Sequence, residues 1–159
     1  MSEATNPRSE LSELNLLFMA MPPVQAMAIQ AIKFEDDILQ VSAPLANNVN
    51  DKDCAFGGSL VSVMTMAAWG LLTELARRES LAADIYIADS QVRFMAPVWG
   101  DLQASASLHA DNRWEALRQA FLSKGKARAM VEAHIKNEQG QTLCQMSARF
   151  ALMSRPSAK

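Results

Sequence analysis

A long stretch without charge runs through the middle of the chain. From Ser59 to about Glu79 the residues are good or tolerable helix formers, and the first charge among them is Glu74. The turns before that residue are apolar around nearly their whole circumference, so such a helix has to be buried on most sides. The uncharged run from Gly57 to Thr73 falls short of the roughly 20 residues that a bilayer span needs, so we expect no membrane contact.

Period-two alternation predicts most of the remaining structure. It is clearest over residues 102–109 and 127–136, where apolar and polar side chains alternate with few exceptions. Four further strands, bounded by turn-forming residues, are expected at residues 27–34, 38–43, 84–94 and 142–152.

Two shorter helices complete the pattern. Leucine, phenylalanine and methionine side chains recur at helical spacing over residues 11–21, and Pro22-Pro23 is expected to end that helix. Another helix is expected between the fourth and fifth strands, because Asn112 and Glu115 have the spacing of a capping box and Gly125 suits a helix end.

The order of these elements predicts an α+β architecture. A curved antiparallel sheet of about six strands can wrap the apolar helix, which resembles the hotdog fold, whose members commonly dimerise to complete a site. At roughly 150 residues per domain, the 159 residues are expected to hold one domain over 11–153. A polar tail at 1–10 and a C-terminal tail at 154–159 flank it.

Charge and cysteine content argue against several classes of function. Fifteen Lys and Arg stand against 17 Asp and Glu, whereas general nucleic-acid binding needs a concentrated basic surface. Cys54 and Cys144 are the only cysteines, and the segment MSEATNPRSE has no apolar signal region, so neither a disulfide framework nor secretion is indicated. We therefore expect a cytoplasmic protein without nucleic-acid partners.

The long helix follows a predicted loop, PLANNVNDKDCAF at residues 44–56, and starts at two glycines. Gly57 and Gly58 leave backbone N–H groups without side-chain cover at the positive end of the helix dipole. A carbonyl oxygen that gains negative charge would be stabilised there. Two glycines also suit close packing or a tight turn, so on their own they are a weak signal.

The loop and the helix start resemble the motif of hotdog acyl-thioesterases, in particular the YiiD C-terminal-type thioesterase family. The matching segment is NVNDKDCAFGGSL at residues 48–60. The resemblance extends from about Leu14 to Met153 and includes AWG at 68–70 and RFMAP at 93–97. It implies an acyl thioester of coenzyme A or acyl carrier protein as substrate, and a homodimer or higher homo-oligomer.

The resemblance also implies roles for individual residues. In hotdog thioesterases with a His-Gly-Gly motif, an Asn six residues before the His, the glycine N–H groups and an Asp nine residues after the His do the work. Those offsets fall on Asn50, Gly57-Gly58 and Thr65, while Phe56 occupies the His position. The glycines would thus bind the thioester oxygen, Asn50 or Asn48 would orient the reacting group, and Thr65 would be a secondary donor.

These departures leave the reaction open. Hydrolysis needs a base to activate water, and residues 57–73 hold no group that accepts a proton near neutral pH. Glu74 lies about 24 Å along the helix from Gly58. Decarboxylation of a malonyl thioester requires only that an enolate be stabilised, and some single-domain relatives are associated with it. Three alternatives therefore remain: hydrolysis, decarboxylation and a non-catalytic module that binds acyl thioesters. Neither reaction requires a bound cofactor.

Several polar residues also have plain structural interpretations. Asn48 and Asn50 belong to a residue type that often forms turns, and Thr65 can bond to the carbonyl one turn back. His109 and His134 fall on the polar side of alternating strands, away from any cysteine, so no metal site is expected. A basic cluster within residues 113–128 suits either the phosphates of a thioester carrier or a solvated face.

Overall fold

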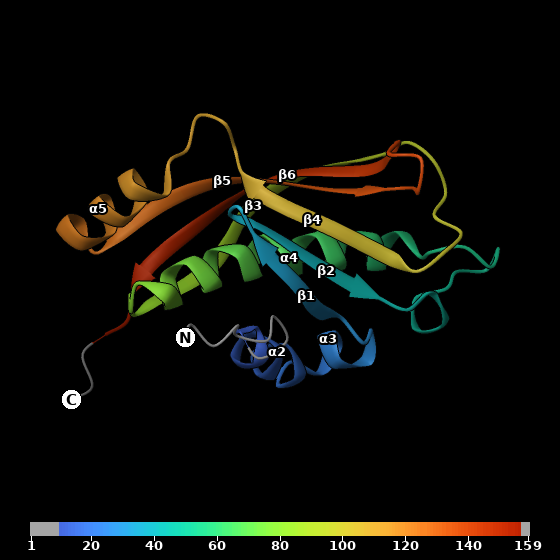
Figure 1. Cartoon of the computed structure of the whole chain (residues 1–159), viewed down its shortest axis with the longest axis horizontal. Helices are drawn as coiled ribbons and strands as arrows, with labels where there is room; N and C mark the ends of the chain where they lie inside the picture. The colour runs from blue at the N-terminus through green and yellow to red at the C-terminus, as the bar shows by residue number, and fades with distance from the viewer. Residues whose placement is uncertain (1–9, 157–159) are drawn as a thin grey trace, which may run out of the picture.

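The computed structural model of the protein describes residues 10–156, in which a curved antiparallel sheet covers one long helix (Figure 1). The α+β hotdog architecture predicted from the sequence is thereby confirmed. The sheet order is β1-β2-β4-β5-β6-β3, so β1 and β3 form its edges. The six strands are β1 (Gln30–Glu35), β2 (Ile38–Ala43), β3 (Ala83–Phe94), β4 (Leu102–Leu108), β5 (Lys126–Lys136) and β6 (Thr142–Ser154).

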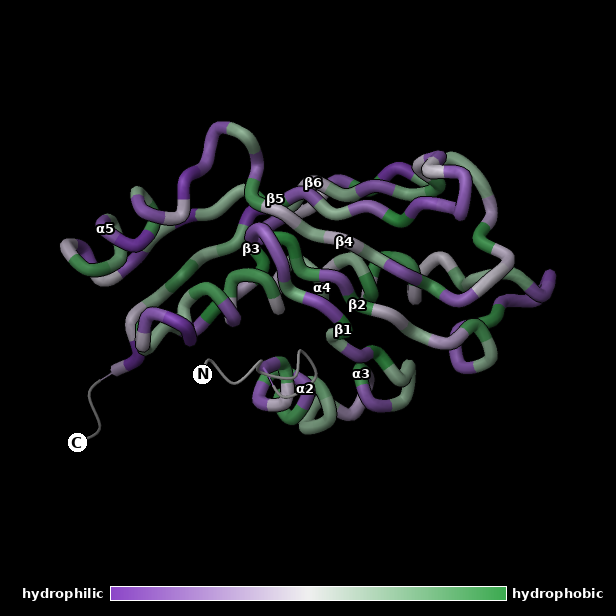
Figure 2. The backbone as a smooth tube through the Cα atoms, viewed as in Figure 1, coloured by the Kyte–Doolittle hydropathy of each residue, from purple (hydrophilic) through white to green (hydrophobic). Residues whose placement is uncertain are grey.

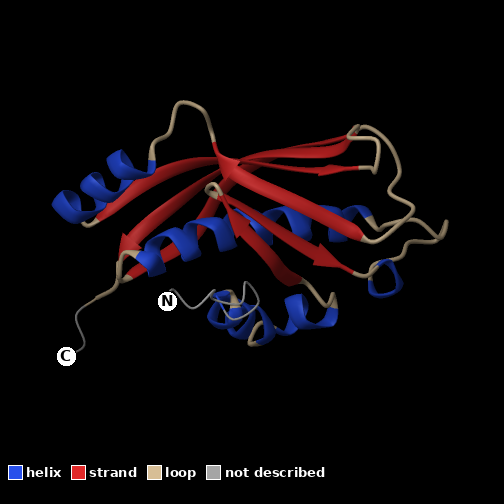
Figure 3. Ribbon diagram, viewed as in Figure 1, coloured by secondary structure: helices blue, strands red, loops and turns tan. Residues whose placement is uncertain are grey.

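The helices lie mainly on one side of this sheet (Figure 3). The long helix α4 crosses the concave face, α2 and α3 lie beside it and β1, and α5 lies at one end of the molecule. Their bounds are α2 (Ser12–Met19), α3 (Pro22–Ala26), α4 (Gly57–Arg78) and α5 (Trp114–Lys124), with a single 3-10 turn η1 (Leu45–Asn47).

The apolar circumference of α4 forms the centre of the core. Figure 2 shows its middle turns as a largely hydrophobic segment beneath the sheet. By length and composition alone α4 could cross a membrane, but 72% of its most apolar 18-residue window is buried inside this fold. Six of its apolar side chains have no exposed surface at all: Val63, Met64, Ala67, Ala68, Leu71 and Leu72.

Close packing fixes the position of α4 against its neighbours. A Cβ atom at Gly70 would lie 2.7 Å from Leu39 Cδ2 in β2 and 3.2 Å from the ring of Phe18 in α2. A side chain at position 70 would require Leu39 or Phe18 to shift, so glycine lets the helix approach both elements this closely. The Trp69 ring lies 6.3 Å from that of Phe18, so α2 is anchored at the same turn.

Three local expectations are corrected by the structure. Pro22-Pro23 follows the end of α2, as expected, but also starts the short helix α3, because a proline at the first helical position lacks only an N–H that would be unpaired anyway. The first strand begins at Gln30 instead of residue 27, since Ala28 adopts a φ of 54°. Asn112 does not cap α5: Arg113 is the N-cap, and Asn112 Oδ1 accepts the Met130 N–H instead.

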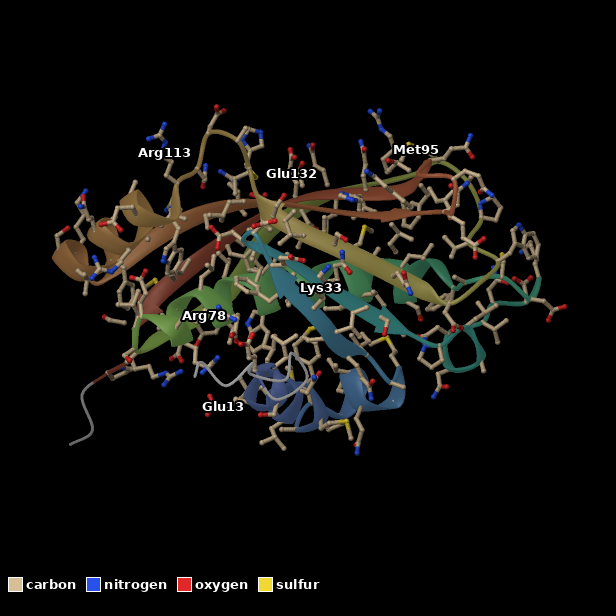
Figure 4. All side chains as sticks on the ribbon, in the orientation of Figure 1. Glu13, Lys33, Arg78, Met95, Arg113 and Glu132 are labelled. Atoms are coloured by element: carbon tan, nitrogen blue, oxygen red, sulfur yellow. The ribbon has the colours of Figure 1, made fainter. Side chains whose placement is uncertain are left out.

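Glu74 lies buried at the far end of α4 and joins several elements. Its carboxylate accepts hydrogen bonds from Arg77 Nη2 at 2.7 Å and Arg78 Nε at 3.0 Å. Arg77 also reaches Glu13 of α2 at 3.2 Å, and Arg78 lies 4.3 Å from the ring centre of Phe34 in β1. Figure 4 labels Arg78 and Glu13 on this side of the molecule. Burial raises the pKa of Glu74, but the two guanidinium groups outweigh it and hold the pKa below its ordinary value.

We predict that Glu74→Gln destabilises the fold by about 2–4 kcal/mol at pH 7, because two partly buried guanidinium groups lose their counter-charge. The loss is smaller than for a fully buried pair because Arg77 and Arg78 remain 37% and 40% exposed and water screens their charges. Urea unfolding measures it. Glu35→Gln, which removes an exposed partner of Lys33, is the control and should leave the midpoint unchanged.

The loss of stability caused by Glu74→Gln should depend on pH. A carboxyl whose pKa is lower in the folded than in the unfolded state contributes its full stabilisation above the unfolded value, here 4.5. That stabilisation is lost as the pH falls through the lower folded-state pKa. The stability difference between wild type and Glu74→Gln should therefore shrink below pH 4.5, and an equal difference at pH 7 and pH 3 would contradict the assignment.

Candidate active site

The loop before α4 is pinned by the side chain of Asn48. Its Nδ2 donates to the carbonyls of Met27 at 2.9 Å and Pro44 at 2.8 Å, and its backbone carbonyl accepts the Phe56 N–H at 2.7 Å. The residue is 2% exposed. Both amide hydrogens are therefore committed to fixing the start of α4 against the segment between α3 and β1, while Oδ1 lies buried without a partner among the described residues.

Asn50 organises the next turn of the same loop. Its Oδ1 accepts the backbone N–H groups of Lys52 at 2.7 Å and Cys54 at 3.2 Å, which is the Asx-turn role that asparagine commonly plays. Its Nδ2 donates to Cys54 Sγ at 3.2 Å. Thiol sulfur is a weak acceptor, so this amide donor is the more easily redirected of the two asparagine side chains.

The first turn of α4 presents unpaired donors. Phe56 is the N-cap, without a side-chain capping bond, and its carbonyl accepts the Leu60 N–H at 3.0 Å. Across residues 10–156, neither a backbone nor a side-chain acceptor pairs with the N–H of Gly57 or Gly58. These groups sit at the positive end of a 22-residue helix and suit an anionic oxygen.

Two aromatic rings flank these donors. A Cβ atom at Gly58 would lie 2.5 Å from the ring of Phe56, and one at Gly57 would lie 3.9 Å from the ring of Phe94 in β3. Both phenylalanines are 55% exposed. The glycine pair is therefore rimmed by apolar surface that is open to solvent, and a side chain at position 58 would require the Phe56 ring to shift.

Thr65 lies on the same side of α4, about 10 Å along the axis from Gly58. Its Oγ1 lies 3.8 Å from Met146 Sδ, a weak contact. It belongs to a stripe of incompletely buried residues that also contains Ser62, Trp69 and Thr73. Trp69 Nε1 donates to the Ile85 carbonyl of β3 at 3.0 Å, so this stripe runs along the edge strand. We call it the open stripe.

The open stripe carries no group that accepts a proton near neutral pH, as the sequence predicted. Of the acids in neighbouring segments, Asp53 is exposed in the loop four residues before Gly57, while two others make ion pairs. Asp51 pairs with Lys52 at 2.8 Å, and Asp89 pairs with Arg149 across β3 and β6. The Arg149 hydrogen bond lowers the pKa of Asp89, which favours its charged, paired form.

The basic cluster lies at the other end of α4. Trp114 Nε1 of α5 donates to Glu79 at 3.2 Å, and Arg118 pairs with Glu79, so α5 packs against the C-terminal end of α4. That end is about 30 Å along the helix from Gly57, which leaves a solvated face as the better interpretation of the cluster within one chain. Over residues 10–156, no group of three or more His, Cys, Asp or Glu could hold a metal ion.

The sequence predicted that the glycines, Thr65 and the two asparagines lie near the start of α4. It did not predict that Phe94 lies there too. Its ring reaches Gly57 because β3 runs antiparallel to β6 along the open stripe, which is a long-range arrangement. The only local signal was the segment RFMAP at 93–97, where strand alternation ends at a proline.

We predict an energetic coupling between Phe56 and Gly58. Gly58→Ala should destabilise the protein while the Phe56 ring is present, because the new methyl group collides with that ring, and Phe56→Ala should relieve the collision. A double-mutant cycle by thermal or urea unfolding should return a coupling of about 1 kcal/mol. Gly57→Ala is the control, since its methyl group meets Phe94 only at an ordinary contact distance; strictly additive effects would show that Phe56 does not cover Gly58.

Several proteins of known structure share the fold of this chain. A protein of unknown function from Chlorobaculum tepidum is 27% identical, with a TM-score of 0.87 over 94% of this chain and 97% of that one. A "putative thioesterase" from Shewanella oneidensis is 27% identical, with a TM-score of 0.82 over 93% and 99% of the two chains. A thioesterase from Haemophilus influenzae shares the fold at 14% identity, with a TM-score of 0.69 over 91% and 90%. The family described as "Putative thioesterase (yiiD_Cterm)" matches residues 13–154, and the chain belongs to it.

Proposed function

We propose that the protein is an acyl-thioester hydrolase that acts at the N-terminus of α4 on acyl-coenzyme A or an acyl carrier protein. The observation that carries the proposal is the pair of unpaired N–H groups at Gly57 and Gly58, between the exposed rings of Phe56 and Phe94. Membership in a thioesterase family supports the same reaction class.

The glycine donors would act on the thioester oxygen. Attack by water on the thioester carbon places negative charge on that oxygen, and two N–H groups at a helix N-terminus stabilise it more than they stabilise the neutral carbonyl. Asn50 Nδ2 would exchange its weak sulfur acceptor for the reacting group. Asn48 would hold the loop, since both of its amide hydrogens are used.

A second reaction is favoured by the absence of a base along the open stripe. A malonyl thioester can lose carbon dioxide by breaking its C–C bond, and the electron pair then forms a thioester enolate whose oxygen the glycine donors would stabilise. Protonation of the enolate carbon by solvent gives the acetyl thioester. This sequence requires no proton acceptor, whereas hydrolysis requires one, and the open stripe holds none.

We also propose that two copies of the chain associate through β3. This strand is 12 residues long, has no partner on its outer edge and presents the large side chains of Tyr86 and Ile87 to solvent. A long unpaired edge with apolar side chains is a template for pairing with another chain. The open stripe runs beside that edge, so a second copy would cover it and could bring a proton acceptor to it.

Both cysteines are free and buried, which supports a reducing, cytoplasmic location.

Products distinguish the two reactions. Purified protein incubated with acetyl, malonyl and longer acyl thioesters of coenzyme A and of acyl carrier protein, and analysed by intact mass, should release free thiol from the acyl substrates if it is a hydrolase. Acetyl thioester formed from malonyl thioester, with acetyl thioester itself stable, would establish the decarboxylase instead. Silence with every substrate would contradict both reactions and leave a binding module.

Variants of Asn50 separate catalysis from loop structure. Asn50→Asp keeps the oxygen that accepts the Lys52 and Cys54 N–H groups but removes the Nδ2 donor, so we expect intact folding and a loss of kcat of at least about tenfold. Asn47→Ala, which alters an exposed asparagine of the same loop, is the control and should retain activity. Full activity in Asn50→Asp would overturn the donor role.

Association through β3 has its own test. Light scattering should give a mass of twice 17.4 kDa for the wild type. Ile87→Lys should raise the dimer dissociation constant at least about tenfold, because a charge would be buried beside the paired edge. Ile38→Lys is a matched control: Ile38 is 39% exposed and Ile87 44%, but Ile38 lies on β2, away from the β3 edge. A monomeric wild type, or equal effects of both variants, would refute this interface.

A further inference from the structure

A row of polar side chains crosses the whole sheet on the face opposite α4. On β5 and β6 the residues that alternate with this row, Ala133, Ile135, Cys144 and Met146, are buried on the side of α4. The row therefore lies on the outer face, as alternation in a strand requires. Strand register places its six members side by side: Lys33, Gln40, Ser105, His134, Gln145 and Arg93.

The end of this row on β3, β5 and β6 is hollowed. A cavity of about 640 Å³ is lined by Arg93, His134, Lys136 and Gln145, together with neighbouring residues of the same three strands. A smaller cavity of about 170 Å³ shares His134 and Lys136 and continues toward β2. Figure 4 shows Glu132, another residue of the larger cavity, on the side of the sheet away from α4. We call this hollow the outer trough.

The outer trough holds cations without counter-charges. Neither Arg93 nor Lys136 makes an ion pair or side-chain hydrogen bond within residues 10–156, whereas most other cations of the fold are paired. Glu132 is the one acid in the lining of the larger cavity, and its carboxylate lies 3.6 Å from His109 Nε2. Burial and the charge of Lys136 lower the pKa of His134 despite Glu132, which favours the neutral imidazole with one donor and one acceptor.

The trough and the candidate active site lie on opposite faces of the same end of β3. Arg93 points into the trough, and the next residue, Phe94, places its ring beside Gly57. The strand ends there, and the chain continues through Met95, which Figure 4 labels at this end of the molecule. A flexible arm whose thioester lies at Gly57 can therefore reach the outer face by passing over the end of β3, without crossing the sheet.

We propose that the outer trough binds the phosphate-bearing end of the thioester carrier, with Arg93 and Lys136 as the charged contacts and Gln145 and His134 as hydrogen-bonding partners. Coenzyme A and a carrier protein's phosphopantetheine arm share this chemistry: a phosphate joined to the thiol through an uncharged, flexible chain. The inference rests on the proposed function, since it concerns how the same site holds its substrate. The basic residues around α5 cannot serve it within one chain, because they lie at the far end of α4.

Calorimetric titration tests the trough without requiring turnover. Coenzyme A should bind the double variant Arg93→Gln/Lys136→Gln at least tenfold more weakly than the wild type. Lys124→Gln/Arg128→Gln removes two cations that also lack ion pairs, near α5, and should bind as the wild type does. Pantetheine, which lacks phosphate, should bind all three proteins equally. Thermal unfolding of each variant establishes that the fold is intact.

The two carriers are separated by a second titration with phosphopantetheinylated carrier protein. A loss of affinity for coenzyme A alone assigns the trough to the free cofactor form, and a loss for the carrier protein alone assigns it to the protein-bound arm. Unchanged affinity for both carriers in Arg93→Gln/Lys136→Gln overturns the proposal. Turnover is measured separately: weakened binding in a protein that turns over no thioester would retain the trough and refute the enzyme, while turnover with an unchanged KM would do the reverse.

Discussion

Burial of α4 is the constraint on which the rest of the structure depends. A helix that is apolar around most of its circumference must be covered on most sides, and a single curved sheet achieves this because each strand directs alternate side chains toward it. The facing positions of the sheet are rich in small residues, which lets the larger methionine and leucine side chains of α4 approach the strands closely. These small residues are Ala104, Ala106, Ala129, Ala133 and Ala148.

The same constraint places the candidate active site. A helix held in the core by its middle turns keeps its first turn fixed, so the N–H groups of Gly57 and Gly58 are positioned before any substrate binds. The sheet ends at β3 and leaves the open stripe of α4 incompletely covered. The candidate site thus lies where the cover of the helix stops, next to an unpaired strand edge, so the proposed chemistry at the helix terminus and the proposed association through β3 concern the same part of the fold.

Charged side chains are paired at one end of α4 and unpaired near the other. At its C-terminal end, Glu74 and Glu79 gather arginines from α4 and α5 into paired networks that join α2, β1 and α5 to the helix. At its N-terminal end the helix presents only backbone donors, and the nearby cations, Arg93 and Lys136, face the outer trough without partners. The first arrangement serves stability, and the second leaves charge available for a ligand.

The sequence by itself determined the elements whose signals are local. Period-two alternation located the strands, the uncharged run located α4, and Gly125 ends α5 with a φ of 71° as its type suggested. The motif around Gly57-Gly58 also identified the family. Predictions that depended on competition between local partners were less secure: Asn112 bonds to β5 instead of capping α5, since a strand N–H was available to it.

Only the tertiary structure decided what is brought together across the chain. The sequence did not place β3 beside β6 at the sheet edge, Phe94 against Gly57, Arg93 in the same row as His134, or Arg77 against Glu13 of α2. It also did not reveal that the Asn48 amide donates to a backbone carbonyl whereas the Asn50 amide donates to a thiol. The physical reason is that alternation fixes which face a side chain occupies, whereas strand order and register follow from covering α4 as a whole.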